Sequence, residues 1–354
     1  MIKYLIGKLI YGFLVILGVV HVVFFLFHAL PGDPVEMMAG PQSNNRIREK
    51  IRTEMGLDQP LSMQFLHYLN DLSPLSVHRH SPEAQHKYNY TPLASWGSER
   101  VFVLKRPFLR RSFQSNRRVD EIVWENLLGT FWLTLTAMFF ATITGVGLGV
   151  LSALGKGSWY DHTIISISVL GMSIPSFIVA ISLAMLFGYY WSHFTGLELT
   201  GSLWVNSPLH GRQLQLKNLI LPALALSVRP LALIVQLTRN SMIEVLSQDY
   251  IRTAYAKGLN RRRIILFHAL RNALNPVTTA VSGWLASLMA GAFFVEYVFS
   301  WKGIGLKTIQ AVNQLDFPVI MGATLSIAAI FVMVNFLMDL IYAWLDPKVR
   351  GRLQ

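Results

Sequence analysis

Few residues of this chain are of a type that does chemistry, and none forms a recognised catalytic motif. The stretch GVLSALGKGS is superficially similar to a phosphate-binding loop, which needs a glycine five positions before Gly155 and Ser or Thr after Lys156. Val150 and Gly157 stand there instead. The chain also lacks the HExxH pattern of zinc hydrolases and the GxSxG pattern of serine hydrolases. We therefore predict no catalytic residue, no resident cofactor and no binding of ATP through this motif.

Histidines are the next candidates. His78, His80 and His86 lie close together in sequence, and imidazole is a common ligand of divalent metals. Such a cluster in a polar loop is more often solvated, so we predict no metal site. His21 and His28 are seven residues apart in an apolar stretch. They can share one helix face, where we expect packing against a neighbouring helix.

Arg229 is an isolated cation inside an apolar stretch. It lies ten residues from Leu219 and ten from Arg239, which is about 15 Å from either end of a helix. A mid-span arginine costs roughly 2.5 to 3.5 kcal/mol on insertion scales, so it needs a carboxylate, backbone carbonyls or a wet cavity. Two interpretations stay open: Arg229 lines a solute pathway and attracts a substrate carboxylate, or it makes a structural contact. For the other embedded charge, Asp339, we predict hydrogen bonds between helices, shared with Asn335.

The composition is that of a polytopic membrane protein. Hydrophobic residues make up 53% of the 354 residues and charged residues only 14%. A membrane-spanning helix needs roughly 20 apolar residues. The sequence therefore predicts an all-α polytopic membrane protein with six transmembrane helices, at Leu9–Leu30, Leu127–Leu154, Thr163–Tyr190, Leu219–Thr238, Val277–Val298 and Val319–Leu345.

The distribution of basic residues predicts the orientation. With both termini in the cytoplasm, the inner segments hold 13 basic residues, whereas the two short outer loops hold only Arg212, Lys217, Lys302 and Lys307. Residues 31–126 carry 13 basic and 11 acidic residues but are longer than the loops to which this rule applies. The net charge of +12 is thus concentrated in inner loops, which argues for a lipid bilayer as partner and against nucleic acid. No cysteine is present, so no disulfide supports the outer parts.

The spans divide the chain into four predicted parts. Residues 1–30 form a tail and the first span, and residues 31–126 form an extracytoplasmic segment. Within that segment, residues 73–107 are rich in His, Ser, Pro and Tyr, and we interpret them as an inserted surface excursion. Residues 127–345 form the core, with the loop 244–275 inside it, and residues 346–354 form a cytoplasmic tail.

Prolines fall at membrane depth in two spans. Pro175, in GMSIPSF, removes a backbone hydrogen bond and should kink the third span, and Pro222 and Pro230 should do the same in the fourth. Broken helices are compatible with a pathway, and Pro175 and Ser173 are our candidates for lining it. Proline is also common in membrane helices generally, so the structural interpretation stays open.

A long basic segment, DYIRTAYAKGLNRRRIILFHALRNALNP, lies between two spans. Its first part, Asp249 to Lys257, has a helical pattern in which Ser247 can act as a cap. The pattern predicts that Ile251, Ala254 and Tyr255 share one face. Gly258 can end this helix in a left-handed conformation. Asn260 can then cap a second helix that begins with three arginines.

At these residues the sequence resembles permease subunits of binding-protein-dependent ABC importers, in the subgroup that handles peptides and nickel. The subgroup commonly reads YIRTAxAKGL followed by HALRNAL, as this chain does. The general family signature fits at Ala254, Gly258 and Leu270, whereas its Glu and terminal Pro are replaced by Arg252 and Arg271. The resemblance extends over most of the chain, including EYVFSW, where Glu296 suggests a structural contact.

The resemblance implies a non-catalytic subunit that forms half of a translocation pathway for di- or oligopeptides in the bacterial plasma (inner) membrane. Implied partners are a second homologous permease subunit, cytoplasmic ABC ATPase subunits, which would hydrolyse ATP, and an extracytoplasmic substrate-binding protein. In such permeases the 249–276 loop forms coupling helices that contact the ATPases. The residues carried over to this role are Asp249, Arg252, Ala254, Ala256, Gly258, Leu259, Leu270 and Asn272.

Other functions stay open at this point. Permeases of similar sequence also import nickel or other small solutes. A self-powered secondary transporter or channel would show coupling carboxylates at the membrane midplane and an inverted repeat, and neither is clear here. A membrane enzyme would need His, Asp or Ser residues converging near one face, and no such set stands out.

Overall fold

The computed structural model describes residues 2–29, 35, 44–54, 56–96, 100–207 and 211–345. The chain forms two compact units. Unit 1 comprises Met1–Phe13, Asn126–Ile309 and Ile327–Gln354, and unit 2 comprises Leu14–Glu125 and Gln310–Ser326. The predicted tail at 346–354 and the predicted start of the outer segment at 31–34 lie outside the described residues. The four predicted domain limits stay predictions.

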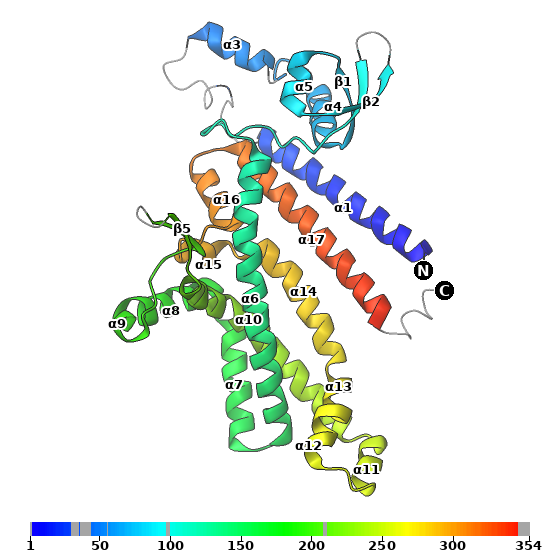
Figure 1. Cartoon of the computed structure of the whole chain (residues 1–354), viewed down its shortest axis with the longest axis vertical. Coiled ribbons are helices and arrows are strands. Elements are labelled where there is room, and N and C mark those ends of the chain that lie inside the picture. The colour runs from blue at the N-terminus through cyan, green and yellow to red at the C-terminus, as the bar shows by residue number, and fades with distance from the viewer. Residues whose placement is uncertain are drawn as a thin grey trace. The chain divides into compact units, whose positions relative to one another are not determined.

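The helices of the first third of the chain are α1 (Ile2–Ala29), α3 (Asn45–Glu54), α4 (Leu61–Leu72) and α5 (Pro82–Tyr88). Three strands accompany them, β1 (Leu75–Arg79), β2 (Thr91–Trp96) and β3 (Arg100–Leu104), so the prediction of an all-α chain is wrong here (Figure 1). The strands form an antiparallel sheet in the order β1-β3-β2. Residues 73–107, predicted as a surface excursion, are therefore a folded β-α-β-β element.

A small apolar cluster holds this element together. Val101 and Val103 alternate with less buried residues along β3 and pack with Tyr90 against Ala84 and Tyr88. Alternation of this kind is what a half-buried strand requires. Pro92 lies on the edge strand β2, at an irregularity in its pairing with β3, where the missing N–H is tolerated.

The three clustered histidines have different environments. His78 is buried, stacks on Tyr88 at 4.1 Å between ring centroids and hydrogen-bonds the Ser76 hydroxyl at 3.0 Å. Burial first, and then the Lys105 cation, lower the pKa of His78 to about 4. His80 and His86 are exposed. The prediction of a solvated loop is thus wrong for His78, and the described residues contain no group of three potential metal ligands.

Both histidines of α1 pack as predicted. The Nδ1 atoms of His21 and His28 lie 3.0 and 2.9 Å from carbonyl oxygens of their own helix. The His21 ring lies on the Phe65 ring of α4, and the Nε2 atom of His28 lies 2.9 Å from the side-chain oxygen of Gln64. A hydrogen bond also joins the two segments of unit 2. The Ser112 hydroxyl, in Leu14–Glu125, donates to the Asp316 carboxylate, in Gln310–Ser326.

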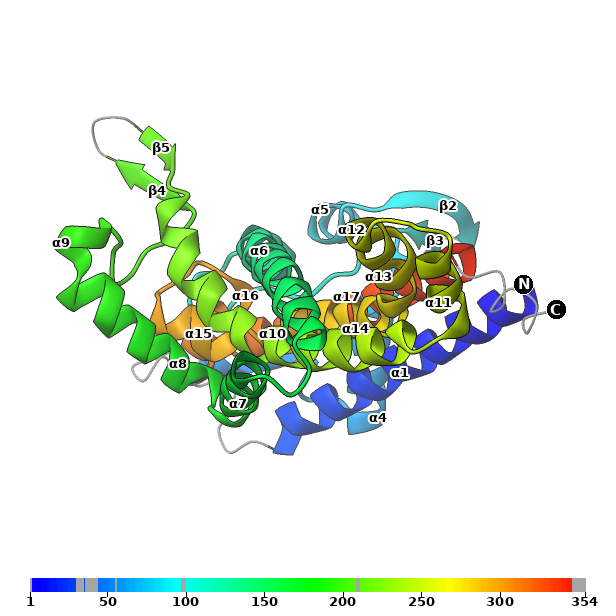
Figure 2. The ribbon, with the colours of Figure 1, turned by 90° about the horizontal axis from the view of Figure 1, so that it is seen from below.

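The rest of the chain is dominated by helices. They are α6 (Val119–Leu154), α7 (Trp159–Ser173), α8 (Ser176–Leu183), the π-helix η1 (Ala184–Tyr190), α9 (Ser192–Thr195), α10 (Lys217–Leu246), α14 (Asn275–Gly291), α15 (Phe293–Val298), α16 (Ile304–Asn313) and α17 (Phe317–Leu345). Between η1 and α10, the strands β4 (Trp204–Ser207) and β5 (Gly211–Leu214) form a hairpin that leads into α10 (Figure 2).

Close packing of α6 on α10 organises unit 1. A side chain added at Gly145 would lie 2.8 Å from Ile234, and one added at Gly149 would lie 2.5 Å from Thr238. Glycines four residues apart let two helix backbones approach closely, as is common between membrane helices. The apolar core around this contact also takes residues from α8, α14 and α15.

Four of the six predicted spans are confirmed as single helices by length and composition, at Ile6–His28, Val119–Leu154, Lys217–Leu246 and Phe317–Leu340. The predicted span Thr163–Tyr190 corresponds to a bent pair of helices, Trp159–Ser173 and Ser176–Tyr190, which has the geometry of a broken span or of a re-entrant loop. The predicted span Val277–Val298 is not continuous, because α14 ends at Gly291 and α15 begins at Phe293. The cytoplasmic placement of the termini stays a prediction.

The predicted kink is confirmed at Pro175. At Pro175 the chain turns by 106° between α7 and α8. By contrast, α10 is one continuous helix through Pro222 and Pro230, so the predicted kink in the fourth span stays a prediction. Both prolines are buried, and the packing around them supports the helix.

The embedded carboxylate of Asp339 makes the predicted contact between helices, an ion pair of 2.8 Å with Lys8 of α1. Asn335 does not share it, because its side chain donates to the Phe331 carbonyl of its own helix.

Candidate functional site

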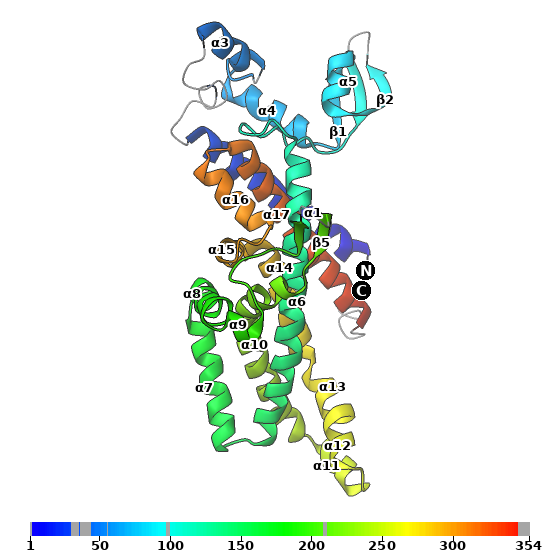
Figure 3. The ribbon, with the colours of Figure 1, turned by 60° about the vertical axis from the view of Figure 1, so that its left-hand side comes forward.

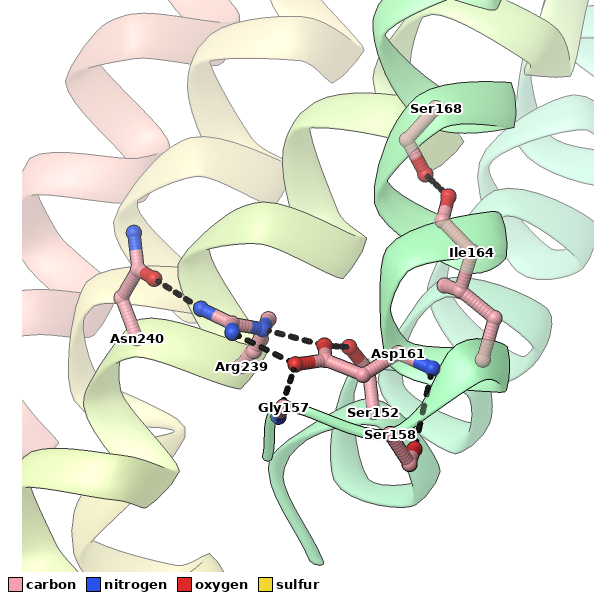
Figure 4. Close-up of polar contacts among 8 residues, drawn as sticks. All are labelled: Ser152, Gly157, Ser158, Asp161, Ile164, Ser168, Arg239 and Asn240. Carbon is pink, nitrogen blue, oxygen red and sulfur yellow. Dashed lines mark hydrogen bonds and ion pairs between the residues drawn. The ribbon is translucent and has the colours of Figure 1, made fainter. Parts of the chain in front are cut away.

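A partly buried ion pair joins α10 to the hairpin formed by α6 and α7 (Figure 4). The Arg239 guanidinium donates from Nε to Oδ1 of Asp161 at 2.7 Å and from Nη2 to Oδ2 at 2.8 Å. The Ser152 hydroxyl and the Gly157 N–H donate to the same carboxylate. The Asp161 side chain is only 1% exposed. Paired geometry of this kind is among the stronger polar contacts that proteins make.

The local sequence explains how Asp161 is placed. Ser158 caps α7, and its hydroxyl accepts the N–H of Asp161 three residues later, at 3.3 Å. A carboxylate in the first turn is also favoured by the helix dipole. Gly157 adopts a φ of +81° in the turn before the cap, which directs its N–H to the carboxylate.

The basic segment after α10 folds into short helices, α11 (Asp249–Ala256), α12 (Arg261–Arg263), the π-helix η2 (Ile264–Ala269) and α13 (Leu270–Ala273). It lies at the same end of unit 1 as the turn between α6 and α7 (Figures 1 and 3). Buried side chains join the segment to both helices, because Ile251 and Ile264 pack in one cluster with Met242 of α10 and Ala153 of α6. The segment is therefore anchored to the helices that the Asp161–Arg239 pair ties together.

The turn between α11 and α12 is built as predicted. Gly258 adopts a φ of +74°, a left-handed conformation that glycine takes without strain, and open space surrounds it. The Asn260 side chain accepts the N–H of Arg262 at 3.1 Å and caps α12. The predicted cap at Ser247 is wrong: Gln248 precedes α11, and the Ser247 hydroxyl donates to the Glu244 carbonyl.

The predicted coupling residues divide into an inner and an outer group. Ala254 is buried, and Leu259 and Leu270 are half-buried against the same apolar cluster. The outer residues are exposed, namely Asp249, Arg252, Ala256, Gly258 and Asn272. The predicted common face holds for Ile251 and Ala254, but Tyr255 points outward and is 47% exposed, because adjacent helical positions are turned about 100° apart.

The outward face of this segment combines cations with aromatic rings. Arg252, Arg261, Arg262 and Arg263 are exposed, as are Tyr250, Tyr255 and Phe267. Asp249 and Arg252 form an exposed ion pair of 3.5 Å, and the Asn272 side chain donates to the Tyr250 hydroxyl at 2.9 Å. Such a surface, rich in arginine and tyrosine, resembles the anchoring part of a protein interface.

The three predicted pathway residues lie on α10 and at the bend between α7 and α8, two parts of unit 1 that pack together, because a side chain added at Gly171 would lie 3.1 Å from Val228. Arg229 is exposed on α10, and its side chain makes no ion pair or hydrogen bond with any described residue. Ser173 and Pro175 are exposed at the bend between α7 and α8, where the Ser173 hydroxyl donates to the Val169 carbonyl. Among the described residues, Arg229 therefore has no partner for a structural ion pair.

Glu296 makes the structural contact expected from its sequence context. Its side chain is fully buried, and its carboxylate accepts the Thr130 hydroxyl at 2.6 Å and the Leu306 N–H at 2.9 Å. The Trp301 indole donates to the Gly129 carbonyl beside it. A side chain added at Gly303 would lie 2.3 Å from the carboxylate, so any larger residue there must displace the Glu296 side chain.

The Asp161–Arg239 pair is not predictable from the sequence. In the sequence, Arg239 is one of the basic residues predicted on the inner side, and Asp161 belongs to no recognised motif. The signal available was Ser158 followed three residues later by Asp161, a capping pattern that marks a helix start but names no partner. The two residues are 78 positions apart, so only the packing of α7 on α10 brings them together.

Comparison with known proteins identifies the class. The family model described as "Binding-protein-dependent transport system inner membrane component" matches residues 145–351, and the corresponding N-terminal model matches residues 1–86. The dipeptide transport system permease protein DppB of Escherichia coli (strain K12) is 35% identical, over 95% of each chain. DppB of Bacillus subtilis (strain 168) is 34% identical, over 95% of this chain and 94% of that protein. The glutathione transport system permease protein GsiC of Salmonella choleraesuis (strain SC-B67) is 31% identical, over 99% of each.

The chain therefore belongs to the family of binding-protein-dependent transport system inner membrane components, and it is a multi-pass membrane protein. The resemblance inferred from the residues around Gly258 is confirmed.

Proposed function

We propose that this chain forms half of the translocation pathway of an ATP-driven importer of di- or oligopeptides in a bacterial plasma (inner) membrane. Its relatives are named for dipeptide and glutathione transport, which supports a peptide substrate. The proposed partners are a second homologous permease, cytoplasmic ATPase subunits and an extracytoplasmic substrate-binding protein. The chain itself carries out no catalysis and needs no cofactor.

The observation that carries this proposal is the construction of the segment from Asp249 to Ala273. Its inner face is fixed to α6 and α10 by Ile251, Ile264 and their neighbours, while its outer face presents arginine and tyrosine side chains. A segment held in this way moves together with α10 and the α6–α7 hairpin, because the Asp161–Arg239 pair joins them. We propose that ATPase subunits bind the outer face and that their closure is passed to the spans through this connection.

Arg229 has a role in the same proposal. It is exposed on α10, far from either end of the helix, and an unpaired cation is costly against lipid. We propose that it faces the pathway between this chain and the second permease, where it attracts the carboxylate of a peptide. Ser173 and Pro175 are proposed to line the same pathway at the bend of the third span.

The test of the coupling role uses two substitutions at one position. Gly258→Asn keeps a residue that accepts the left-handed conformation, whereas Gly258→Val introduces a β-branched residue that does not. Open space around Gly258 means that the two variants differ through the backbone and not through a clash. We expect both to insert, and we expect Gly258→Val to lose most peptide uptake while Gly258→Asn retains it.

The readouts are uptake of a labelled dipeptide, ATP hydrolysis and co-purification of the ATPase subunits, measured on the assembled complex. Loss of uptake in Gly258→Val, with ATP hydrolysis no longer stimulated by substrate, supports coupling through this turn. Normal uptake by Gly258→Val at normal expression would show that the turn does not couple the subunits.

A further inference from the structure

Unit 2 contains a cavity of about 850 Å³, which is within the range of small-molecule sites. Its walls come from α4, β1, α5, the start of β3 and the chain that follows β3. The lining includes apolar and aromatic side chains, among them Met63, Leu66, Tyr88, Phe108 and Phe113. All of these belong to one compact unit.

The charge of this lining is strongly unbalanced. Five cations line the cavity, Arg79, Lys87, Arg100, Arg110 and Arg111, against a single carboxylate, Asp71. That carboxylate is already engaged, because the Tyr88 hydroxyl donates to it at 3.0 Å and Arg110 lies 3.8 Å from it. The cavity wall therefore carries an excess of positive charge that the described residues do not neutralise.

Two of the arginines lie directly opposite each other. Arg79 ends β1 and Arg100 begins β3, and the two are paired in the antiparallel register. Like charges at such positions repel and destabilise a sheet. Neither side chain forms an ion pair or hydrogen bond with any residue that the structure describes. A bound anion between them would turn this repulsion into attraction.

A third arginine is held in a strained conformation at the same cavity. Arg110 has a φ of +66°, which non-glycine residues rarely adopt. Its carbonyl accepts the Val119 N–H at 3.1 Å, and its guanidinium lies over the Tyr68 ring, 5.4 Å from the centroid. Backbone strain of this kind is concentrated at binding sites, where the surrounding structure fixes a side chain in place.

We propose that this cavity is a binding site for an organic anion, with a phosphate or carboxylate group held by Arg79 and Arg100 and an apolar body against the aromatic wall. Arginine binds both groups through paired N–H donors. The site is distinct from the proposed coupling segment, and the proposal does not depend on the transport role.

The test uses the full-length protein in phosphatidylcholine nanodiscs, with phenyl phosphate as the probe and titration calorimetry as the measurement. We expect saturable binding of one phenyl phosphate per chain. Binding should weaken at least tenfold in Arg79→Gln and in Arg100→Gln. Arg106→Gln is the matched control, because Arg106 is an exposed arginine of the same unit that does not line this cavity.

A second measurement separates binding from folding. Without the probe, Arg79→Gln and Arg100→Gln should melt at the same temperature as the unmodified protein or higher, because each removes the repulsion between the pair. The probe should raise the melting temperature of the unmodified protein and not that of the variants. A lower melting temperature in both variants would show that the arginines are structural and would overturn the proposal.

Two other results would also overturn it: no saturable binding of phenyl phosphate, or binding that Arg106→Gln weakens as much as Arg79→Gln does. The source of the anion is distinguished by replacing phosphatidylcholine with phosphatidylglycerol. Loss of phenyl phosphate binding in those discs would assign the site to a lipid headgroup, and unchanged binding would assign it to a soluble anion.

Discussion

Replacing Asp161 with alanine should lower the free energy of unfolding by about 3–5 kcal/mol, the loss expected when one partner of a buried ion pair is removed. The structure places this substitution toward the lower part of that range, because the Arg239 side chain that would lose its partner is 21% exposed and water can solvate part of its charge. Arg239 loses both of its bonds to Asp161, and the Ser152 hydroxyl and the Gly157 N–H lose their acceptor as well. The Ser152 hydroxyl is fully buried, and a buried donor left without a partner adds a further cost.

A matched double variant tests whether the cost comes from the unpaired charge. Asp161→Leu together with Arg239→Met removes both charges and fills a similar volume, and such replacements are often neutral or stabilising. We therefore expect the double variant to recover most of the stability that Asp161→Ala loses. Asp249→Ala is the exposed control, because it removes the surface ion pair between Asp249 and Arg252. The side chains of Asp249 and Arg252 are 96% and 77% exposed. Exposed ion pairs contribute little to stability, so we expect little change in the free energy of unfolding.

The assay is equilibrium unfolding in mixed micelles, followed by tryptophan fluorescence, with peptide uptake measured in parallel. If Asp161→Ala unfolds at the same denaturant fraction as the unmodified protein, the Asp161–Arg239 pair does not stabilise the packing of α10 on the α6–α7 hairpin. If the double variant is as unstable as Asp161→Ala, the cost arises from packing and not from charge.

Three further predictions concern single sites. Gly303→Ala should lower the free energy of unfolding by about 1–3 kcal/mol, because the added carbon meets the buried Glu296 carboxylate; Gly147→Ala, which meets nothing within 4 Å, should be neutral or stabilising in the same unfolding assay, and equal effects would refute the clash. The pKa of His78 is lowered to about 4 by burial and by the Lys105 cation, so the unfolded chain takes up a proton between pH 6.5 and 4 that the folded chain does not. The contribution of His78 to stability is therefore complete above pH 6.5 and declines as the pH falls toward 4; hydrogen exchange of residues 75–104 should speed up over this range, and His78→Phe should remove this part of the pH dependence. Arg229→Met should reduce uptake of dipeptides at an unchanged melting temperature, and unchanged uptake would exclude a pathway role.

The membrane helices were largely predictable from the sequence because their signal is local. Long apolar runs predict four spans that the structure forms as single helices. Pro175 predicts the bend that the structure has between α7 and α8. The turn at Gly258 was predictable for the same reason, since a single residue type permits its backbone conformation. The span predicted at Val277–Val298 was not interrupted by any strong local signal, and its break after Gly291 depends on the packing of α15.

The parts that were missed depend on contacts between distant residues. The strands β1 and β3 pair residues about 20 to 30 positions apart, and their short alternating runs lie among polar residues typical of a loop. The Asp161–Arg239 pair and the opposed arginines Arg79 and Arg100 likewise become visible only once the helices and strands are packed.

Transport by reconstituted protein tests most directly whether this chain imports peptides only as part of an ATP-driven assembly. This chain would be placed in liposomes, first alone and then with a partner permease, the ATPase subunits and a binding protein, and entry of a labelled dipeptide would be followed with and without ATP. The account predicts accumulation only in the complete assembly, only with ATP, and its loss in Gly258→Val. Accumulation of the dipeptide by this chain alone, without nucleotide, would contradict it.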